Sequence, residues 1–158
     1  MLFSPYKLGS IELKNAVVMA PMTRNRSSRD NVPQAMVATY YSQRANAGLI
    51  ISEGTSPSPN GVGYPRIPGI YNDVQIAAWK TVTDAVHEKG GKIFLQLMHT
   101  GRVSHQSCLP DDAVILAPSA IQMKGKIYTD DAGMVDYSAP KEMSLAEIHS
   151  TIAEYVKA

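Results

Sequence analysis

The chain has a single cysteine, Cys108, among its 158 residues. One thiol excludes an internal disulfide framework and any Cys-x-x-Cys zinc or iron–sulfur motif within these residues. No apolar run approaches the roughly 20 residues of a membrane-spanning helix, and the amino terminus lacks the basic and apolar regions of a secretory signal. The net charge is only +1, which gives no reason to expect nucleic acid or a membrane surface as a partner. We therefore expect a cytoplasmic protein.

Hydrophobic residues make up 44% of the chain and charged residues 18%, as in an ordinary globular protein. Three short apolar runs stand out, at residues 16–22, 48–54 and 92–98, and each becomes polar or small at its carboxyl end. Amphipathic stretches follow the first two runs, so the pattern predicts parallel βαβ units. Ligands of such folds bind beyond the carboxyl ends of the strands, which makes Thr23, Gly54 and Gln96 the first candidates for chemistry.

The first helix is predicted to begin with Pro33 at its first position and to stop at Gly48. Met36, Tyr40 and Arg44 recur every four residues within it.

The second helix is predicted to open with a capping box of Asn72 and Gln75 and to end at residues 90–91, both glycine. Its expected buried stripe consists of Ile76, Trp79, Val82 and Val86.

Two hairpins and a last helix complete the pattern. A Gly9-Ser10 turn predicts a type II′ hairpin over residues 6–14, and residues 121–128 and 134–137 flank a second turn. Residues 55–71 and 100–119 are expected to be irregular. Ser144 and Glu147 form a capping box before a helix whose expected apolar stripe is Ile148, Ile152 and Val156.

A closed (β/α)₈ barrel takes roughly 250 residues, whereas three βα units are present here. An open three-stranded sheet would expose two unpaired edges. We therefore interpret residues 1–158 as the amino-terminal part of a single TIM-barrel domain: an α/β segment with three β/α units, an amino-terminal hairpin and a capping hairpin. Either the chain is truncated, or another chain completes the barrel.

Several motifs occur in one order: Ala-Pro-Met-Thr-Arg at 20–24, Tyr-Tyr-Ser-Gln-Arg-Ala at 40–45, Gly-Leu-Ile-Ile-Ser-Glu at 48–53, Gly-Ile at 69–70, Gln-Leu-Met-His-Thr-Gly-Arg at 96–102 and Ala-Pro-Ser-Ala at 117–120. Together they closely resemble the first part of the old yellow enzyme family. These proteins are FMN-dependent ene-reductases, also described as NADH:flavin oxidoreductases and N-ethylmaleimide reductases. The resemblance covers the whole chain but less than half of a family member.

The resemblance implies a (β/α)₈ barrel with FMN across its carboxyl-terminal mouth. NAD(P)H reduces the flavin, which passes hydride to the activated C=C bond of an enone, maleimide or nitroalkene. It further implies that the end of the first strand lines the flavin ring, through Ala20, Pro21, Met22 and Thr23. Gly54 corresponds to the small residue that lets main chain approach the flavin, and Gln96 to the glutamine that pairs with its pyrimidine edge.

Tyr64 corresponds to an aromatic residue beside the substrate. Met98 stands where close relatives often carry tryptophan, so we assign it to a more open substrate pocket. The family's proton donor and the groups that hold the FMN phosphate lie downstream of this segment. No catalytic residue is therefore assigned within it, and Thr23 is expected only to tune the flavin by a hydrogen bond.

Simpler interpretations stand beside these assignments. Gln96 could be a hydrogen-bonded core amide, and Gly54 only a bend at a strand end. His99 and His105 lack a third metal ligand at a recognisable spacing, so structural roles are expected. Arg102 is expected to form a buried ion pair rather than to bind phosphate, and Cys108 has no base beside it that would make it a nucleophile.

Two alternatives remain open for the whole chain. It could be a non-catalytic partial barrel that needs a complementing chain or self-association, or part of a dienoyl-CoA reductase, whose family shares this barrel.

Overall fold

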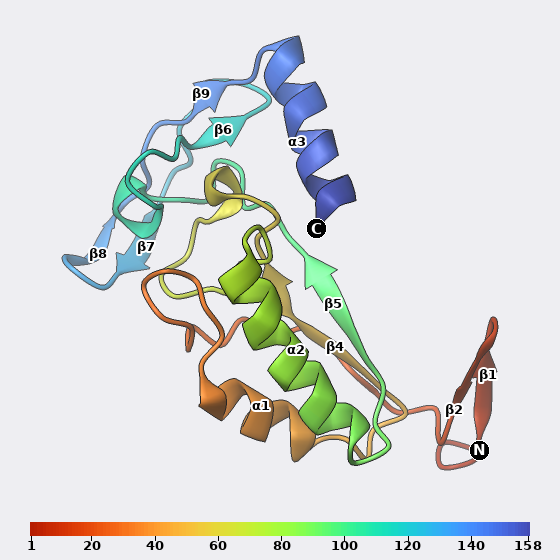
Figure 1. Ribbon diagram of the computed structural model, residues 1–158. Coiled ribbons are helices and arrows are strands. Elements are labelled where there is room, and N and C mark those ends of the chain that lie inside the picture. Colours follow the sequence, from red (N-terminus) through yellow and green to blue (C-terminus); the bar gives the residue numbers. More distant parts are fainter.

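A computed structural model describes all residues, 1–158, and contains the predicted parallel sheet (Figure 1). Strands β3 (Val18–Met19), β4 (Leu49–Thr55) and β5 (Ile93–Leu97) lie in the order β3-β4-β5. Val18 is paired with Leu49, and Ile50 with Ile93, in parallel register. The carboxyl ends of all three strands therefore meet at one edge, as the three apolar runs predict.

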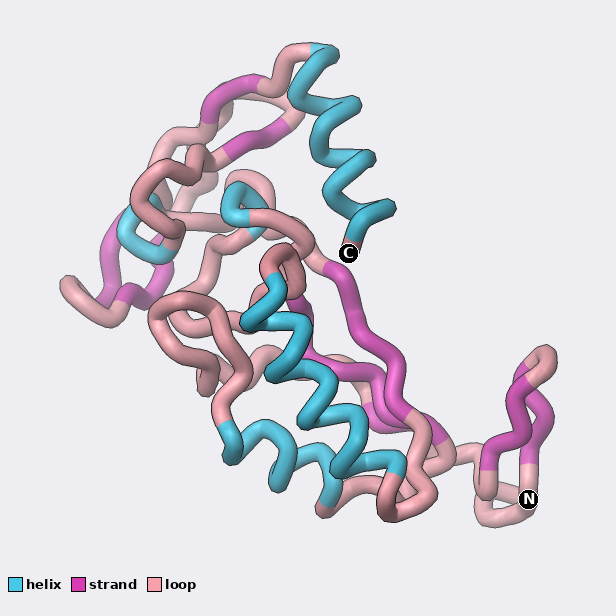
Figure 2. Tube along the Cα trace, viewed as in Figure 1, coloured by secondary structure: helices cyan, strands magenta, loops and turns pink.

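Helices α1 (Ala35–Ser42) and α2 (Asp73–His87) cover one face of this sheet (Figures 1 and 2). Between the helices and the sheet lies a buried apolar cluster, the helix-side core. It consists of Val37, Tyr41, Ala45, Ile50, Ile70, Trp79, Val82 and Val86. Burial of each large side chain stabilises the fold by about 1.5–3 kcal/mol, so this contact holds the βαβ unit together.

Helix α1 is shorter than predicted, and its buried side chains lie one position after the residues that recur every four. It begins at Ala35, two residues after Pro33, and ends six residues before Gly48. Met36 is 59% exposed, whereas Val37 and Tyr41 are buried. A Cβ atom at Gly48 would lie 1.9 Å from the carbonyl oxygen of Asn15, so this glycine permits close approach of two chain segments rather than capping a helix.

Helix α2 confirms its predicted start and most of its stripe. The Asn72 side chain accepts a hydrogen bond from the Gln75 N–H at 2.9 Å. The second hydrogen bond of the capping box differs from the prediction. The Gln75 side chain accepts from the N–H of Tyr71, at 3.0 Å, rather than from that of Asn72. Ile76 is 49% exposed and Gln75 is buried in its place. Gly90, with φ +68°, follows the helix end as expected.

A β-bulge in β4 was not predicted. Ile51 is paired with Phe94 and Gly54 with Gln96, so β4 has one more residue than β5 between these pairs. The Ser52 hydroxyl accepts a hydrogen bond from the Gln96 N–H at 3.1 Å within the bulge. A bulge reverses the alternation of side chains along a strand. Glu53 consequently faces the helices, and Gly54 faces the opposite side of the sheet.

The two predicted hairpins lie at opposite ends of the molecule (Figure 1). Strands β1 (Tyr6–Leu8) and β2 (Ile11–Leu13) flank Gly9, whose φ of +59° fits the predicted turn. Strands β7 (Lys126–Thr129) and β8 (Gly133–Asp136) form the second hairpin, which begins later than expected.

The segments expected to be irregular contain two short 3₁₀ turns, η1 (Pro59–Gly61) and η2 (Gln106–Cys108). They also contain β6 (Leu116–Ala117), which pairs in parallel with β9 (Lys141–Glu142). The β6–β9 pair was missed because two-residue strands carry no periodicity.

Helix α3 (Leu145–Lys157) begins with the predicted capping box. The Ser144 hydroxyl accepts from the Glu147 N–H at 3.3 Å, and the Glu147 carboxylate accepts from the Ser144 N–H at 2.8 Å. Its predicted stripe of Ile148, Ile152 and Val156 is exposed. None of the helices is long and apolar enough to cross a membrane.

The face of the sheet away from α1 and α2, here called the inner face, is open. Val18 and Phe94 lie on it and are 51% and 45% exposed. A sheet covered by helices on one face and open on the other has the form of one sector of a barrel wall.

Candidate site at the carboxyl ends of the strands

Gly54 and Gln96 lie opposite each other in the register of β4 and β5, at the edge where ligands of this architecture bind. Leu95 and Leu97 pack against the helix-side core, so Gln96 between them points to the inner face. The main-chain N–H of Gln96 donates to the Ser52 hydroxyl at 3.1 Å, whereas its carboxamide has no partner in the protein. A core amide with satisfied hydrogen bonds is therefore not what the structure contains.

Residues 20–23 follow β3 directly and are all exposed. The first attachment after them is at Arg24, whose N–H donates to the Glu53 carboxylate at 3.1 Å. The Thr23 hydroxyl makes no hydrogen bond within the chain and is free to bind a ligand.

Met98 covers Gly54. A Cβ atom at position 54 would lie 2.6 Å from both the sulfur and the methyl carbon of Met98. This contact gives Gly54 a reason to be glycine that involves no ligand. The assignment of Gly54 to the flavin stays a prediction.

The two residues assigned to the substrate lie against one apolar cluster. Tyr64 and Met98 both pack on it, and its buried members are Val62, Ile67, Leu109, Ala113 and Ile115. Burial raises the pKa of the Tyr64 hydroxyl, and the neighbouring Tyr137 acts in the same direction. Tyr64 is therefore a neutral hydroxyl at physiological pH.

Glu53 is a residue of this site that the sequence interpretation did not assign. It is only 1% exposed, and the Tyr41 hydroxyl lies 3.4 Å from one carboxylate oxygen while Arg24 N–H binds the other. The main-chain N–H of Glu53 donates to the Tyr41 hydroxyl at 2.7 Å. Burial raises the pKa of the Glu53 carboxyl, although the two hydrogen bonds and the Arg24 charge oppose that rise. The available signal was an acidic residue inside an apolar strand, which is rare unless it is paired.

His99 and His105 each have one hydrogen-bonded ring nitrogen, and the buried Nε2 of His99 has no partner. His99 accepts from the Gly101 N–H at 3.0 Å, and burial lowers the pKa of its imidazole. His105 lies 2.8 Å from the Ser107 hydroxyl. No group of three potential ligands is placed to hold a metal ion.

Arg102 does not form the expected ion pair. Its guanidinium donates to the carbonyl oxygen of Ile121 at 2.8 Å and to the Ser119 hydroxyl at 2.9 Å. Its role is to tie the end of β5 to the segment before the second hairpin.

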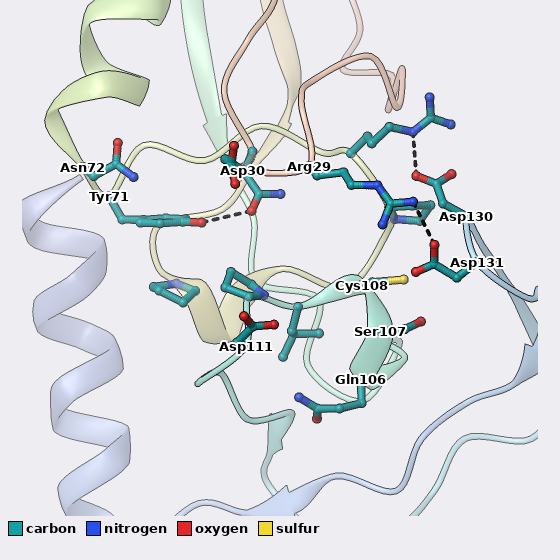
Figure 3. Close-up of a pocket in the computed structure, with 16 residues that line it drawn as sticks. Arg29, Asp30, Tyr71, Asn72, Gln106, Ser107, Cys108, Asp111, Asp130 and Asp131 are labelled. Atoms are coloured by element: carbon teal, nitrogen blue, oxygen red, sulfur yellow. Dashed lines mark hydrogen bonds and ion pairs between the residues drawn. The ribbon is translucent and has the colours of Figure 1, made fainter.

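A cleft of about 870 Å³ lies among loops and includes none of the predicted site residues (Figure 3). Two ion pairs cross its rim, Arg29–Asp131 at 2.8 Å and Arg66–Asp130 at 2.9 Å. Burial raises the pKa of the Cys108 thiol to about 11, which leaves it protonated at neutral pH. Cys108 is therefore not an activated thiol at neutral pH.

Comparison with known proteins identifies the fold. A family model described as "NADH:flavin oxidoreductase / NADH oxidase family" matches residues 1–158. The chain is 47% identical to 12-oxophytodienoate reductase 1 of Oryza sativa subsp. japonica, over 99% of this chain and 40% of that protein.

Among solved structures, an old yellow enzyme homologue from Zymomonas mobilis superposes with a TM-score of 0.93 at 44% identity, over 99% of this chain and 43% of that one. Morphinone reductase in complex with tetrahydroNAD gives a TM-score of 0.89 at 46% identity, over 98% and 44%. The chain thus spans about two fifths of the length of these relatives. The predicted barrel fold is confirmed for this portion, and the chain belongs to the NADH:flavin oxidoreductase / NADH oxidase family.

Proposed function

We propose that this chain supplies part of an FMN-dependent ene-reductase. In that reaction NAD(P)H reduces the flavin, which then passes hydride to the activated C=C bond of an enone, a maleimide or a nitro compound. The observation that supports this most directly is the free Gln96 carboxamide beside Gly54, at the carboxyl ends of β4 and β5 in a chain of this family.

The residues at this edge fit a flavin. A flavin pyrimidine ring presents adjacent donor and acceptor atoms, and the unpartnered carboxamide of Gln96 offers the complementary pair. The free hydroxyl of Thr23 supplies another donor, and residues 20–22 add small and apolar surface. When bound, FMN supplies the hydride chemistry, while these residues orient its ring and stabilise charge at its polar edge.

The substrate would lie beside Tyr64 and Met98. Both pack on one apolar cluster, so they present an aromatic hydroxyl and a flexible thioether from the same side. This arrangement suits a small, largely apolar substrate with one polar activating group. We place the protein in the cytoplasm, which the single cysteine supports.

A second possibility is a non-catalytic partial barrel that requires a complementing chain or a second copy. The exposed inner face and the exposed stripe of α3 favour it. A missing carboxyl-terminal part of the barrel is the partner that we propose for these surfaces.

The two possibilities are separated by purifying this chain alone and together with the remaining portion of the rice reductase. We expect colourless protein alone, and yellow protein with flavin absorbance and NAD(P)H-dependent loss of enone absorbance in the mixture. The rice portion alone is the control. A mixture that forms a complex but binds no FMN contradicts the proposed function, and an active yellow chain without any partner contradicts the partial-barrel alternative.

A further inference from the structure

We propose that Glu53 is a positioning residue: its buried carboxylate holds the main chain at Arg24 and thereby fixes the Thr23 hydroxyl at the flavin edge. The flavin half of this inference rests on the proposed function. The hold on Arg24 does not.

The loop before the bond to Glu53 has no hydrogen-bonded attachment of its own. Residues 20–23 make no main-chain or side-chain hydrogen bond to the rest of the chain, and Pro21 has no N–H to donate. The bond from Arg24 N–H to Glu53, at 3.1 Å, is the first contact of this kind after β3. Without it, the main chain after Thr23 would be held by the contact of the Arg24 guanidinium with the Tyr40 ring and by the next main-chain hydrogen bond, from the Ser27 N–H.

The bulge in β4 places the carboxylate where it can do this. Because the strand carries an extra residue before Gly54, Glu53 points beneath the loop and toward α1 rather than into the open inner face. The Tyr41 hydroxyl then connects to Glu53 twice, accepting from its N–H at 2.7 Å and facing its carboxylate at 3.4 Å. These two contacts with Tyr41 therefore fix the position of the Glu53 carboxylate beneath the loop.

The charge environment supports the same role. The Arg24 guanidinium lies 4.6 Å from the centre of the Tyr40 ring, and the Arg44 guanidinium lies 3.8 Å from it. Neither forms a close ion pair with Glu53, so the carboxylate is balanced chiefly by hydrogen bonds. Burying a carboxylate costs free energy unless a specific partner compensates for the lost water. For Glu53 that partner is the main-chain N–H of Arg24. Since Glu53 is 1% exposed and faces away from the inner face, it does not touch the reacting atoms.

Three variants test whether Glu53 holds the main chain at Arg24. In Glu53→Ala the acceptor is lost, and we expect hydrogen exchange of the Arg24 amide to accelerate about tenfold or more. Glu53→Gln retains a carbonyl oxygen that accepts from Arg24 N–H, so exchange should stay near that of the parent. Glu142→Ala removes an exposed glutamate of β9 and serves as the control. An Arg24 exchange rate that is the same in Glu53→Ala and the parent overturns the proposal.

The second readout is the midpoint potential of bound FMN in the complemented protein. Glu53→Ala should lower this midpoint potential, as Thr23→Val should. The potential of the double variant should be close to that of either single variant, because both changes act through the Thr23 hydroxyl. If the shifts in midpoint potential of the two single variants add fully in the double variant, Glu53 does not act through Thr23, and this part of the proposal is overturned. If Glu53→Ala does not fold, Glu53→Asp retracts the carboxylate by one methylene and should show both effects. If the parent binds no FMN, the proposed function fails. The hydrogen-exchange experiment still shows whether Glu53 holds the main chain at Arg24.

Discussion

Gln96 is the polar side chain of β5, set between two leucines that pack toward the helices. Replacing it with alanine removes an amide that has no protein partner, so the fold should be little affected. We expect FMN to bind about fivefold more weakly, since one net hydrogen bond contributes about 1 kcal/mol. A titration of flavin fluorescence in the complemented protein measures this, with Gln43→Ala on the exposed end of α1 as the control. Equal affinity in Gln96→Ala and the parent would remove Gln96 from the flavin site.

Thr23 is expected to act on the potential of the flavin rather than on its retention. Thr23→Val keeps the shape of the side chain but loses the hydroxyl, so charge on the reduced flavin is less well stabilised. We expect a midpoint potential lower by about 20 mV, which corresponds to one net hydrogen bond on a two-electron couple. Spectroelectrochemistry measures it, and Thr81→Val on α2 is the matched control. A potential unchanged in Thr23→Val would exclude the hydrogen bond.

Cys108 should be unreactive at neutral pH. Burial raises the pKa of its thiol to about 11, so the thiolate needed for alkylation is scarce below that pH. Because folding raises this pKa above the ordinary value of 9.0, the group's contribution to stability is complete below pH 9 and is lost as the pH rises toward 11. Rates of iodoacetamide labelling against pH should rise with an inflection well above that of free cysteine. An inflection at the ordinary value would show that the thiol is solvated.

At the scale of elements, the turn of the β7–β8 hairpin is tied to two distant loops. Asp130 pairs with Arg66, and Asp131 with Arg29. Arg66 has a φ of +53°, unusual for a residue with a side chain, and its carbonyl oxygen accepts from the Ser27 N–H at 3.1 Å. The Arg66 pair therefore joins the hairpin to the loop that carries Tyr64, and the Arg29 pair joins it to the loop between β3 and α1.

The double change Asp130→Asn with Asp131→Asn should loosen this hairpin. We expect amide exchange over β7 and β8 to rise by about two- to fivefold. The difference from the parent should shrink at high salt, because the Arg29–Asp131 pair is exposed and the Arg66–Asp130 pair partly so, and such pairs are weak and screened. Asp136→Asn, on β8 without an ion pair, is the control. If amide exchange over β7 and β8 at low salt is equally fast in the parent and in the double variant, the ion pairs do not order the hairpin.

The sequence predicted the elements whose signal is local. Apolar runs located the three parallel strands, and the side-chain caps Asn72 and Ser144 located the starts of α2 and α3. The bounds of α1 were wrong, and the recurrence of Tyr40 did not reveal that its neighbour Tyr41, which packs beside Trp79, is the buried tyrosine. The β4 bulge depends on the register with β5, which no pattern within β4 reveals.

The same distinction applies to the site. Alternation along β5 was sufficient to predict that Gln96 faces away from its leucine neighbours. The contact of Met98 with Gly54, and of Glu53 with Arg24, joins residues on different segments. Such contacts follow from tertiary packing and could not be read from spacing.

For the whole molecule, large apolar side chains are exposed on the inner face, on α3 and along the amino-terminal residues 1–8. Val18 and Phe94 lie on the inner face, and Ile152 and Val156 on α3. We expect the isolated chain to self-associate at micromolar concentration and to bind an apolar dye, since exposed patches of this kind mark interaction surfaces. Addition of the complementing portion should reduce both signals.

A variant comparison by sedimentation velocity tests which surface is responsible. Phe94→Ser should reduce self-association of the isolated chain, whereas Val114→Thr, an exposed valine off the sheet, should not. A monomeric parent chain that binds no dye would show that these surfaces are covered in some other way.

The extra residue in β4 also limits how this protein can change during evolution. Removing one residue at position 52 or 53 would restore regular pairing with β5 and rotate the remainder of the strand by half a turn. A carboxylate would then enter the barrel lumen, or the loop after β3 would lose the hydrogen bond between the Arg24 N–H and Glu53. Insertions and deletions should therefore be far rarer between Ile51 and Gly54 than in the neighbouring loops, even though the segment reads as an ordinary apolar strand.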